Sequence, residues 1–293
     1  MTPKDTRFGV LTLATANDYL KAIGLALSLR SSNPDVPTAV ACSKRVQKLL
    51  APFFDFLIDE RSGIRGFEHK VHLDQYTPFD STFFFDSDVL VFKPLKQFVE
   101  GWNNPIYTAV GRYCSEGFST FGLDYAAVLR KIGRERLHVI EGAGHALFRK
   151  PDCVEVFELA RHVTKNYHDY AGNIRYADED AMAISMTLLG LPVSPYGEFF
   201  SRYCSAAPGT MELDASRALC RFIWVDTGKP FEPCMMHFAA DEAPVAYTME
   251  LIRLFRAFKV PTDGLLSLGI GDYWTNRIRL PLSSKLKSLK AMF

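Results

Sequence analysis

The sequence predicts an α/β fold in which a mainly parallel, mixed sheet is flanked by helices. Short apolar runs alternate with segments of helical spacing along the first third of the chain, a pattern typical of parallel strands joined by helices. A strongly hydrophobic run ends in two aspartates, Asp86 and Asp88, and loops after parallel strands are where such folds bind ligands. At 293 residues, 48% of them hydrophobic, the chain can bury a sizeable core.

The elements of the first part alternate regularly. Residues 8–13 form an apolar run typical of a strand, and residues 18–30 follow with apolar side chains at helical spacing. The alternation continues with a strand at 36–42, a helix at 44–50 and strands at 54–58 and 81–85. Strands joined through helices pair in parallel, which predicts one sheet for this part of the chain.

The second part is less regular. We predict strands at 104–110 and 146–148, helices at 123–132, 151–167, 178–189 and 243–258, and a loop-rich stretch with short strands at 192–228. The sequence shows no internal repeat and no linker that would divide it. We therefore expect a single domain at 1–265, followed by a basic amphipathic tail at 266–293.

Charge and cysteine content argue against several classes of protein. Lys and Arg total 34 against 33 Asp and Glu, so the net charge of +1 gives no reason to expect a nucleic-acid partner. The six cysteines are scattered without a CxxC pair, which favours a reduced, cytoplasmic setting. The N-terminal segment lacks the apolar stretch of a signal peptide, and no run has the length of a membrane span. We expect a protein that is soluble or lies on a membrane surface.

Asp86 and Asp88 form the first candidate site. On an extended backbone, residues two apart project to one face, and two adjacent carboxylates are costly without a cation. Because Asp and Ser both favour turns, residues 86–88 also fit a plain turn after a strand. The apolar runs on both sides favour the metal interpretation. Hard oxygen donors suit Mn²⁺ or Mg²⁺ and, through the metal, a diphosphate.

His237, in the segment MMHFAAD, is a candidate third ligand. A lone histidine among apolar residues is usually a hydrogen-bonded core residue. It becomes a ligand candidate here because an ion held by two carboxylates readily accepts an imidazole. His69 and His72 are three apart, but nothing near them completes a zinc site.

Three loops contain further candidates. TLATANDY has no glycine-rich phosphate cradle, so its polar residues either cap the next helix or, with Tyr19 as a stacking ring, contact a nucleotide base. EGAGH, which contains Gly142, either makes a turn or lets a ligand approach the backbone. ADEDA, which contains Asp178, opens a predicted helix, where the helix dipole favours acidic residues.

Five segments together resemble a known family. TLATANDYLKA, FFFDSDVLVF, GAGHALF, DEDAMAI and HF have the order and spacing of the motifs of glycosyltransferase family 8, which contains glycogenin and bacterial galactosyltransferases. The resemblance covers about residues 8–240. It implies the GT-A fold, in which a nucleotide-binding α/β sheet merges with an acceptor-binding region. It also implies a Mn²⁺-dependent retaining hexosyltransferase that uses a UDP-sugar of the glucose or galactose type.

The resemblance also implies roles for individual residues. Asp86 and Asp88 match the metal-binding Asp-x-Asp of the family, and His237 matches its third protein ligand. Asp178 and Glu179 match the acidic pair that contacts the transferred sugar, and we take them as the catalytic residues. The expected substrate-binding residues are Leu13, Thr15, Ala16 and Tyr19 at the uridine, Arg61 and Lys70 near nucleotide and sugar, Ser87 between the aspartates, and Gly142 and Ala143 along the sugar pocket.

The chain departs from the family pattern at several places. Ala16 and Gly142 stand where the family often has asparagine, which leaves the sugar and base preference open. Ala240 and Ala243 stand where a glycine and a diphosphate-binding lysine follow the histidine, so either another cation binds the phosphate or donor binding is weak. Two alternatives stay open: a nucleotide-sugar-binding protein with weak or lost catalysis, and a nucleotidyltransferase, which would normally show a glycine-rich phosphate loop.

The tail NRIRLPLSSKLKSLKAMF is basic and amphipathic. A helix after Pro281 would place the apolar residues at 282, 286, 289 and 293 on one stripe with lysines beside it. Such a segment either packs on the domain or binds an anionic membrane surface. The second alternative fits a glycan or lipid-linked acceptor and a peripheral position at the inner face of the membrane.

Overall fold

The computed structural model describes residues 7–14, 18–102, 106–141, 144–194, 197, 199–238 and 243–273. The chain forms two compact units that alternate along the sequence. Unit 1 is Met1–Ala16, Val36–Asp86 and Leu95–Gly197, and unit 2 is Asn17–Asp35, Ser87–Pro94 and Glu198–Phe293. We call residues 86–88 the aspartate motif. The chain passes from unit 1 to unit 2 within this motif, between Asp86 and Ser87.

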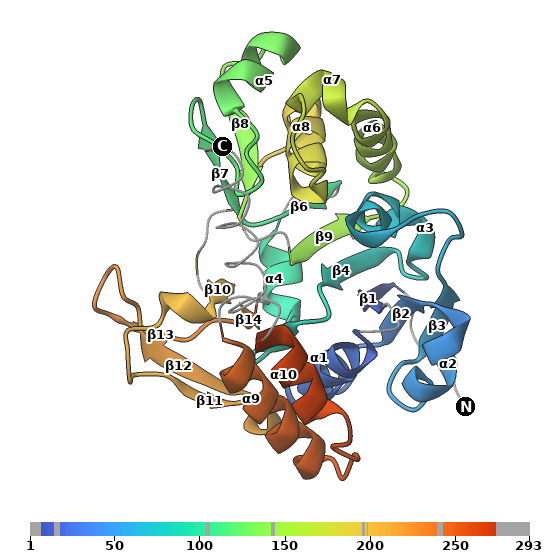
Figure 1. The fold of residues 1–293 in the computed structure, drawn as a ribbon, viewed down its shortest axis with the longest axis vertical. Coiled ribbons are helices and arrows are strands. Elements are labelled where there is room, and N and C mark those ends of the chain that lie inside the picture. Colours follow the sequence, from blue (N-terminus) through green and yellow to red (C-terminus); the bar gives the residue numbers. More distant parts are fainter. Residues whose placement is uncertain are drawn as a thin grey trace, which may run out of the picture. The chain divides into compact units, whose positions relative to one another are not determined.

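A six-stranded sheet forms the centre of unit 1 (Figure 1). The strand order is β3 (Phe56–Asp59), β2 (Thr38–Cys42), β1 (Phe8–Ala14), β4 (Ser81–Phe85), β9 (His145–Arg149) and β6 (Tyr107–Thr108). The first four of these strands pair in parallel, whereas β9 pairs antiparallel with both β4 and β6. The predicted mainly parallel, mixed sheet is therefore confirmed.

Helices flank this sheet in unit 1. α6 (Val154–Lys165) and α8 (Asp178–Leu189) pack against each other and against η1 (Gly66–His72). Their apolar side chains share one core with the sheet, in which Phe84 of β4, Phe157 of α6 and Ile184 of α8 are buried together. The other elements are α2 (Lys44–Leu50), α3 (Leu73–Tyr76), α4 (Lys96–Gly101), α5 (Tyr125–Ile132), α7 (Tyr167–Ala171) and the antiparallel pair β7 (Gly111–Cys114) and β8 (Leu137–Ile140).

β4 lies in the interior of the sheet, between β1 and β9. Its aromatic residues Phe83 and Phe85 are fully buried and stack on each other. Close packing continues next to it on β1, where a Cβ on Gly9 would lie 2.4 Å from the ring of Phe79. Apolar burial therefore determines where β4 ends, and so where the aspartate motif begins.

In unit 2, helices α1 (Tyr19–Ser32) and α9 (Pro244–Ala257) pack so closely that a Cβ on Gly24 would lie 2.3 Å from the Leu251 side chain. A three-stranded sheet has the order β10 (Phe200–Arg202), β14 (Met235–His237) and β5 (Val89–Val91). β14 pairs parallel with β10 and antiparallel with β5. The other elements are β11 (Glu212–Asp214), β12 (Leu219–Ile223), β13 (Pro230–Phe231), η2 (Tyr203–Ser205), η3 (Ala215–Arg217) and α10 (Leu265–Tyr273).

α10 crosses the boundary that we predicted between a domain and a tail at residue 265. Most of the predicted tail, from residue 274 onward, lies outside the described residues. The division into a domain at 1–265 and a tail at 266–293 therefore stays a prediction. Within the described part of the chain, no helix is both long enough and apolar enough to cross a membrane.

Candidate active site

The Asp86 carboxylate lies at the carboxyl end of β4. Its backbone N–H donates a hydrogen bond of 2.9 Å to the carbonyl of Gly144, which precedes β9. In unit 1 this carboxylate belongs to a charged group with Lys70 and Asp178. Lys70 Nζ donates a hydrogen bond of 2.8 Å to Oδ2 of Asp86 and lies 3.5 Å from Oδ2 of Asp178.

Lys70 comes from η1, and Asp178 is the first residue of α8, where the helix dipole favours a negative charge. Their side chains are only 12% and 8% exposed. Charges this deeply buried are stable only when an opposite charge lies nearby. The ammonium of Lys70 therefore stabilises both carboxylates, Asp86 and Asp178.

Burial raises the pKa of all three carboxyls in the first turn of α8. For Asp178, the nearby Lys70 ammonium opposes this effect. For Glu179, burial and then the charges of Asp178 and Asp180 raise the pKa to about 8. For Asp180, hydrogen bonds from Tyr167 and Ser119 oppose the effect of burial on the pKa. Glu179 is therefore mostly protonated at neutral pH and can donate a hydrogen bond to a hydroxyl or phosphate oxygen.

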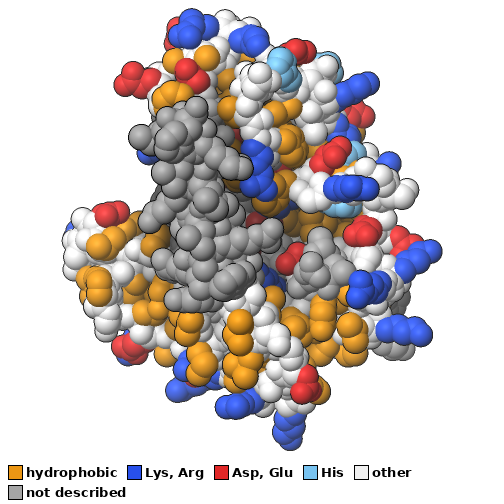
Figure 2. Space-filling model, viewed as in Figure 1, with side chains coloured by type: hydrophobic (Ala, Val, Ile, Leu, Met, Phe, Trp, Pro, Cys, Tyr) orange, Lys and Arg blue, Asp and Glu red, His pale blue; other side chains and the backbone are white. Residues whose placement is uncertain are grey.

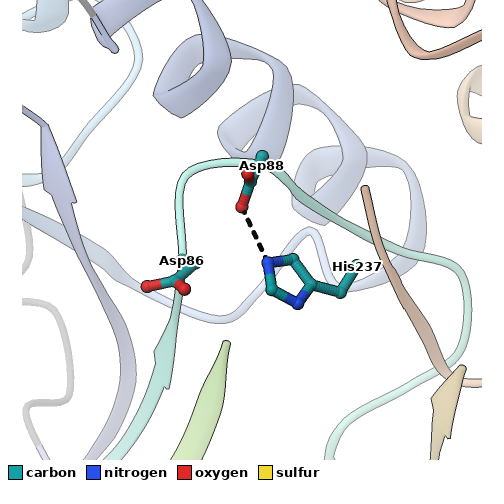
Figure 3. A group of neighbouring side chains, drawn as sticks. All are labelled: Asp86, Asp88 and His237. Carbon is teal, nitrogen blue, oxygen red and sulfur yellow. Dashed lines mark hydrogen bonds and ion pairs between the residues drawn. The ribbon is translucent and has the colours of Figure 1, made fainter. Parts of the chain in front are cut away.

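In unit 2, Asp88 and His237 form a second charged group (Figure 3). The antiparallel register of β5 and β14 places Val89 opposite His237, and the N–H of Phe238 donates a 3.0 Å hydrogen bond to the Asp88 carbonyl. Nε2 of His237 lies 3.1 Å from Oδ1 of Asp88, and both side chains are partly exposed. Backbone pairing alone thus brings this imidazole to this carboxylate.

Asp86, Asp88 and His237 together fit a divalent cation. One ligand atom from each lies within 4.8 Å of the others, and Figure 3 shows the three as neighbouring side chains. Only Ser87 separates the aspartates, so the chain itself keeps the two carboxylates close. Neighbouring ligands of an octahedral Mg²⁺ or Mn²⁺ ion are about 3 Å apart, which matches the 3.1 Å between His237 and Asp88. In the described part of the chain, this is the one group of three potential ligands.

The backbone at the aspartate motif differs from the extended conformation that we assumed. Asp86 lies just beyond β4, and Ser87 and Asp88 form a turn before β5. The Ser87 carbonyl accepts a hydrogen bond of 3.4 Å from the hydroxyl of Tyr247. The argument from an extended strand was wrong, because Asp and Ser favour a turn once the buried aromatic run has ended. Each carboxylate instead has its own partner, Lys70 for Asp86 and His237 for Asp88.

The structure describes some of the predicted substrate-binding residues but not others. Leu13 lies in β1, paired with Ala41, and is partly exposed. Tyr19 is the first residue of α1 and is also partly exposed. Arg61 is exposed, and its backbone N–H donates a 3.1 Å hydrogen bond to the hydroxyl of Tyr76. Thr15, Ala16, Gly142 and Ala143 lie outside the described residues, so their roles stay predictions.

Sequence reasoning missed two residues of unit 1, His145 and Tyr107. Both line a small cavity together with Lys70, Asp178 and Glu179. His145 is the first residue of β9, directly opposite Phe85, and its Nε2 accepts a 3.0 Å hydrogen bond from the N–H of Val110. Its position just after the glycine pair of GAGH was a usable signal. Tyr107 had none, because only the pairing of β6 with β9 brings it to this place.

Known glycosyltransferase structures share this fold. Similarity to the bifunctional glycosyltransferase WbbM has a TM-score of 0.56 at 14% identity, over 88% of this chain and 52% of that one. The galactosyltransferase LgtC, solved with donor and acceptor sugar analogs, gives 0.54 at 16% identity, over 86% and 96%. GlyE from Streptococcus pneumoniae TIGR4 gives 0.55 at 13% identity, over 88% and 66%.

No protein-family model and no curated protein matches the sequence. This chain spans about half the length of WbbM but nearly all of LgtC. At these low identities the similarity shows the fold and not the reaction. The chain has the mixed α/β fold, with a mainly parallel central sheet, of GT-A glycosyltransferases.

Proposed function

We propose that the protein is a Mn²⁺-dependent retaining hexosyltransferase of glycosyltransferase family 8, which transfers glucose or galactose from a UDP-sugar to a glycan or lipid-linked acceptor. The observation that carries the proposal is the donor set of Asp86, Asp88 and His237 at the end of an interior strand, in a fold shared with glycosyltransferases. Carboxyl ends of parallel strands are where α/β sheets bind nucleotides. Carboxylate-bound Mn²⁺ or Mg²⁺ commonly binds substrate phosphates.

Positive charge at the diphosphate comes from two sources in this proposal. When bound, the divalent ion neutralises the charge that develops on the departing diphosphate. Lys70, held between Asp86 and Asp178, supplies a second positive charge. Ala243, which stands where the resembling family has a lysine, supplies none. The remaining assignments follow the resemblance: uridine at Leu13, Thr15, Ala16 and Tyr19, nucleotide at Arg61, and sugar near Ser87, Gly142 and Ala143.

Asp178 and Glu179 orient the transferred sugar. Asp178 accepts hydrogen bonds from sugar hydroxyls, and Glu179, whose pKa rises to about 8, donates one at neutral pH. Asp178 is paired with Lys70 and is therefore not a free nucleophile. We propose front-face substitution: the incoming hydroxyl forms its bond to the anomeric carbon on the face that the diphosphate leaves, and a departing phosphate oxygen takes the hydroxyl proton. This step retains the anomeric configuration.

Calorimetry of UDP binding tests the metal and donor assignments. The wild type should bind UDP far more tightly with Mn²⁺ than with EDTA, and Asp88→Asn should abolish that difference. Asp59→Asn is a matched control, because Asp59 also ends a parallel strand of the same sheet, β3, and is not part of the donor set. Equal UDP affinity of the wild type in Mn²⁺ and in EDTA would refute the metal assignment.

Turnover separates the proposal from its alternatives. An active transferase releases UDP from UDP-glucose or UDP-galactose in the presence of Mn²⁺, with water as a slow acceptor. A binding protein with lost catalysis binds UDP but releases none from the sugar nucleotide. A nucleotidyltransferase instead releases pyrophosphate from a nucleoside triphosphate.

We also propose that the protein is cytoplasmic and binds the anionic inner face of the membrane, through its tail and the adjacent part of unit 2. α9 and α10 expose Val245, Met249, Leu266 and Ile270, which line one groove of 310 Å³. Figure 2 shows hydrophobic side chains over the region where Figure 1 labels these helices. The basic segment after Tyr273 follows α10 directly in the sequence. Apolar side chains next to Lys and Arg are the combination that binds anionic lipid surfaces.

Vesicle sedimentation tests this membrane proposal. The full chain should sediment with anionic vesicles, less so as salt rises, and deletion of residues 277–293 should release it while Mn²⁺-dependent UDP binding is kept. If the full and truncated chains sediment equally poorly at low salt, the tail is a packing element and the proposal fails.

A further inference from the structure

Phe67 and Phe121 form an aromatic pair in unit 1. It lies next to Lys70, Asp86 and Asp178, which we call the Lys70 group. Their ring centroids are 6.3 Å apart, with an interplanar angle of 67°. Phe67 is 41% exposed. Lys70 Nζ lies 5.6 Å from the centroid of the Phe67 ring, and the guanidinium carbon of Arg175 lies 5.9 Å from it. Because Lys70 Nζ also lies 3.5 Å from Asp178, the Phe67 ring lies about one side-chain length from a carboxylate that we propose to bind the sugar.

A partly buried hydrogen-bond network holds Phe121 in place. Oγ of Ser119 accepts hydrogen bonds from the N–H groups of Phe121 and Leu123, at 3.2 Å and 3.1 Å. The same hydroxyl donates a 3.3 Å hydrogen bond to Oδ2 of Asp180. The hydroxyl of Tyr167 donates to that oxygen as well, at 2.7 Å. Asp180, the third acidic residue at the start of α8, therefore holds the loop that carries Phe121.

Backbone hydrogen bonds also hold this loop in one conformation. The N–H of Ser119 donates to the Leu123 carbonyl, and the N–H of Tyr125 donates to the Gly117 carbonyl, both at 3.0 Å. Gly117 and Gly122 have φ angles of +107° and +94°, which other residues rarely adopt. The partly exposed Phe121 on this loop and the exposed Phe67 on η1 are therefore arranged in advance of binding, which lowers the entropy that a ligand must overcome.

A sugar ring matches the chemistry of this surface. The ring of a hexose presents C–H groups on its face and hydroxyls around its rim. The face can pack on a phenyl ring as apolar surface, while the hydroxyls accept hydrogen bonds from a guanidinium or ammonium at its edge. An acyl chain would use the rings but would leave the guanidinium of Arg175 without a hydrogen-bond acceptor on the ligand.

We propose that Phe67 and Phe121 form a stacking platform for the acceptor, and that the acceptor presents a hexose ring to it. Asp180 is a positioning residue, which acts on the platform through Ser119. This inference rests on the proposed function and narrows its acceptor to a saccharide, free or lipid-linked, whose terminal ring stacks beside the Lys70 group.

Transfer to methyl glucosides and methyl galactosides tests the platform. In Phe67→Leu, which keeps apolar bulk but removes the ring, the ratio of sugar transfer to UDP-sugar hydrolysis should fall about fivefold, since one aromatic contact contributes about 1 kcal/mol. In Phe67→Trp, which keeps an aromatic ring, the ratio should stay close to that of the wild type. Tyr113→Leu is the matched control, because Tyr113 is also 41% exposed in unit 1, and it should leave the ratio unchanged.

Asp180→Ala and Asp180→Asn test the positioning role. Asp180→Ala should raise the KM for the glycoside more than it lowers kcat, and Asp180→Asn, which keeps an oxygen acceptor for Ser119, should restore the lower KM. A general loss of folding would instead reduce Mn²⁺-dependent UDP binding in both variants.

Saturation-transfer NMR with the same methyl glycosides keeps this inference separate from the proposed function. Saturation of protein aromatic protons should reach the ring C–H protons of the glycoside in the wild type and be reduced in Phe67→Leu. A wild type that neither binds UDP nor hydrolyses UDP-sugars refutes the proposed function, whereas the glycoside signal still decides the platform. Absence of that signal in the wild type, an unchanged ratio in Phe67→Leu, or an equal fall in Tyr113→Leu would overturn the platform.

Discussion

The two charged groups that begin at the end of β4 are balanced in different ways. In unit 1, the ammonium of Lys70 lies between the carboxylates of Asp86 and Asp178, so the protein itself supplies one fixed positive charge to this group. In unit 2, Asp88 faces the imidazole of His237, which carries a positive charge only when protonated. The second group therefore gains most from a cation that comes from outside the chain.

This difference indicates what each group contributes. A buried ammonium between carboxylates is part of the stability of the fold, because removing it leaves charge uncompensated in a poorly solvated place. Asp88 and His237 are about as buried as Asp86 and Lys70, but the imidazole is charged only when protonated, so this pair adds less fixed charge to the fold and provides ligands for a metal. Mutation of Lys70 should therefore change the free energy of unfolding, and mutation of His237 should change metal affinity.

The largest effect is expected for Lys70→Met. This change keeps the length of the side chain but leaves Asp86 and Asp178 without their cation, so the free energy of unfolding should fall by about 3 kcal/mol near neutral pH. Urea denaturation measures this. Lys44→Met removes a lysine that is 83% exposed in its pair with Asp59, and it should change stability by less than about 0.5 kcal/mol. An equal fall in the free energy of unfolding in Lys70→Met and Lys44→Met would contradict this view of the Lys70 group.

His237→Asn sharpens the other side of the comparison. Loss of one of three protein ligands should weaken Mn²⁺ binding about 100-fold, or about 2.7 kcal/mol, while stability in EDTA changes little. The shift of the melting temperature with increasing Mn²⁺ measures this affinity. His162→Asn, at an exposed histidine of α6, is the control. A large loss of stability in EDTA would show that His237 is a structural residue of the core.

Glu179 should give unit 1 a pH-dependent stability. Its pKa of about 8 in the folded state lies above the ordinary value of 4.5. The folded chain therefore holds a proton that the unfolded chain releases, and the free energy of unfolding should fall as pH rises from 4.5 toward 8. Since Glu179 is partly exposed, we expect the loss to be about 2 kcal/mol, and Glu179→Gln should remove it.

Urea denaturation in acetate buffer and in buffer of slightly alkaline pH, on the wild type and on Glu179→Gln, measures this difference. Glu135→Gln, at an exposed glutamate of the same unit, is the control. Part of the pH dependence should survive in Glu179→Gln, because burial also raises the pKa of Asp178 and Asp180. The same pH dependence in Glu179→Gln as in the wild type would exclude Glu179 as its source.

The smallest effect is expected for Tyr167→Phe. The change removes a 2.7 Å hydrogen bond to Asp180, which should lower the free energy of unfolding by about 1 kcal/mol. The loss should be greater at high pH, because this bond favours the charged form of Asp180. Thermal denaturation measures it, with Tyr170→Phe in the same helix as the control. A loss no larger than that of Tyr170→Phe would mean that the network adds nothing to the stability of unit 1.

The sequence by itself determined the local elements and the place of the aspartates. Residues 44–50, 81–85 and 178–189 form α2, β4 and α8 with the predicted bounds. Periodicity of apolar residues determines which face is buried, so a helix or strand with a clear pattern can be read without tertiary information. Other predicted elements had less accurate bounds. The strand predicted at 104–110 is the two-residue β6, and the helix predicted at 151–167 ends at Lys165, before α7.

The tertiary structure decided which residues meet. Asp86 and Lys70 are 16 residues apart, Asp180 and Ser119 are 61 apart, and Asp88 and His237 are 149 apart. The resemblance grouped His237 with Asp86 and Asp88 as ligands of one metal, and the pairing of β5 with β14 is what brings His237 to Asp88. It gave Lys70 no carboxylate partner, and the contacts of Lys70 with Asp86 and Asp178 follow from the packing of η1 on α8. The aromatic pair of Phe67 and Phe121 had no counterpart in any sequence pattern. Local spacing records only which residues share a face of one element, whereas a site between elements depends on how their faces pack.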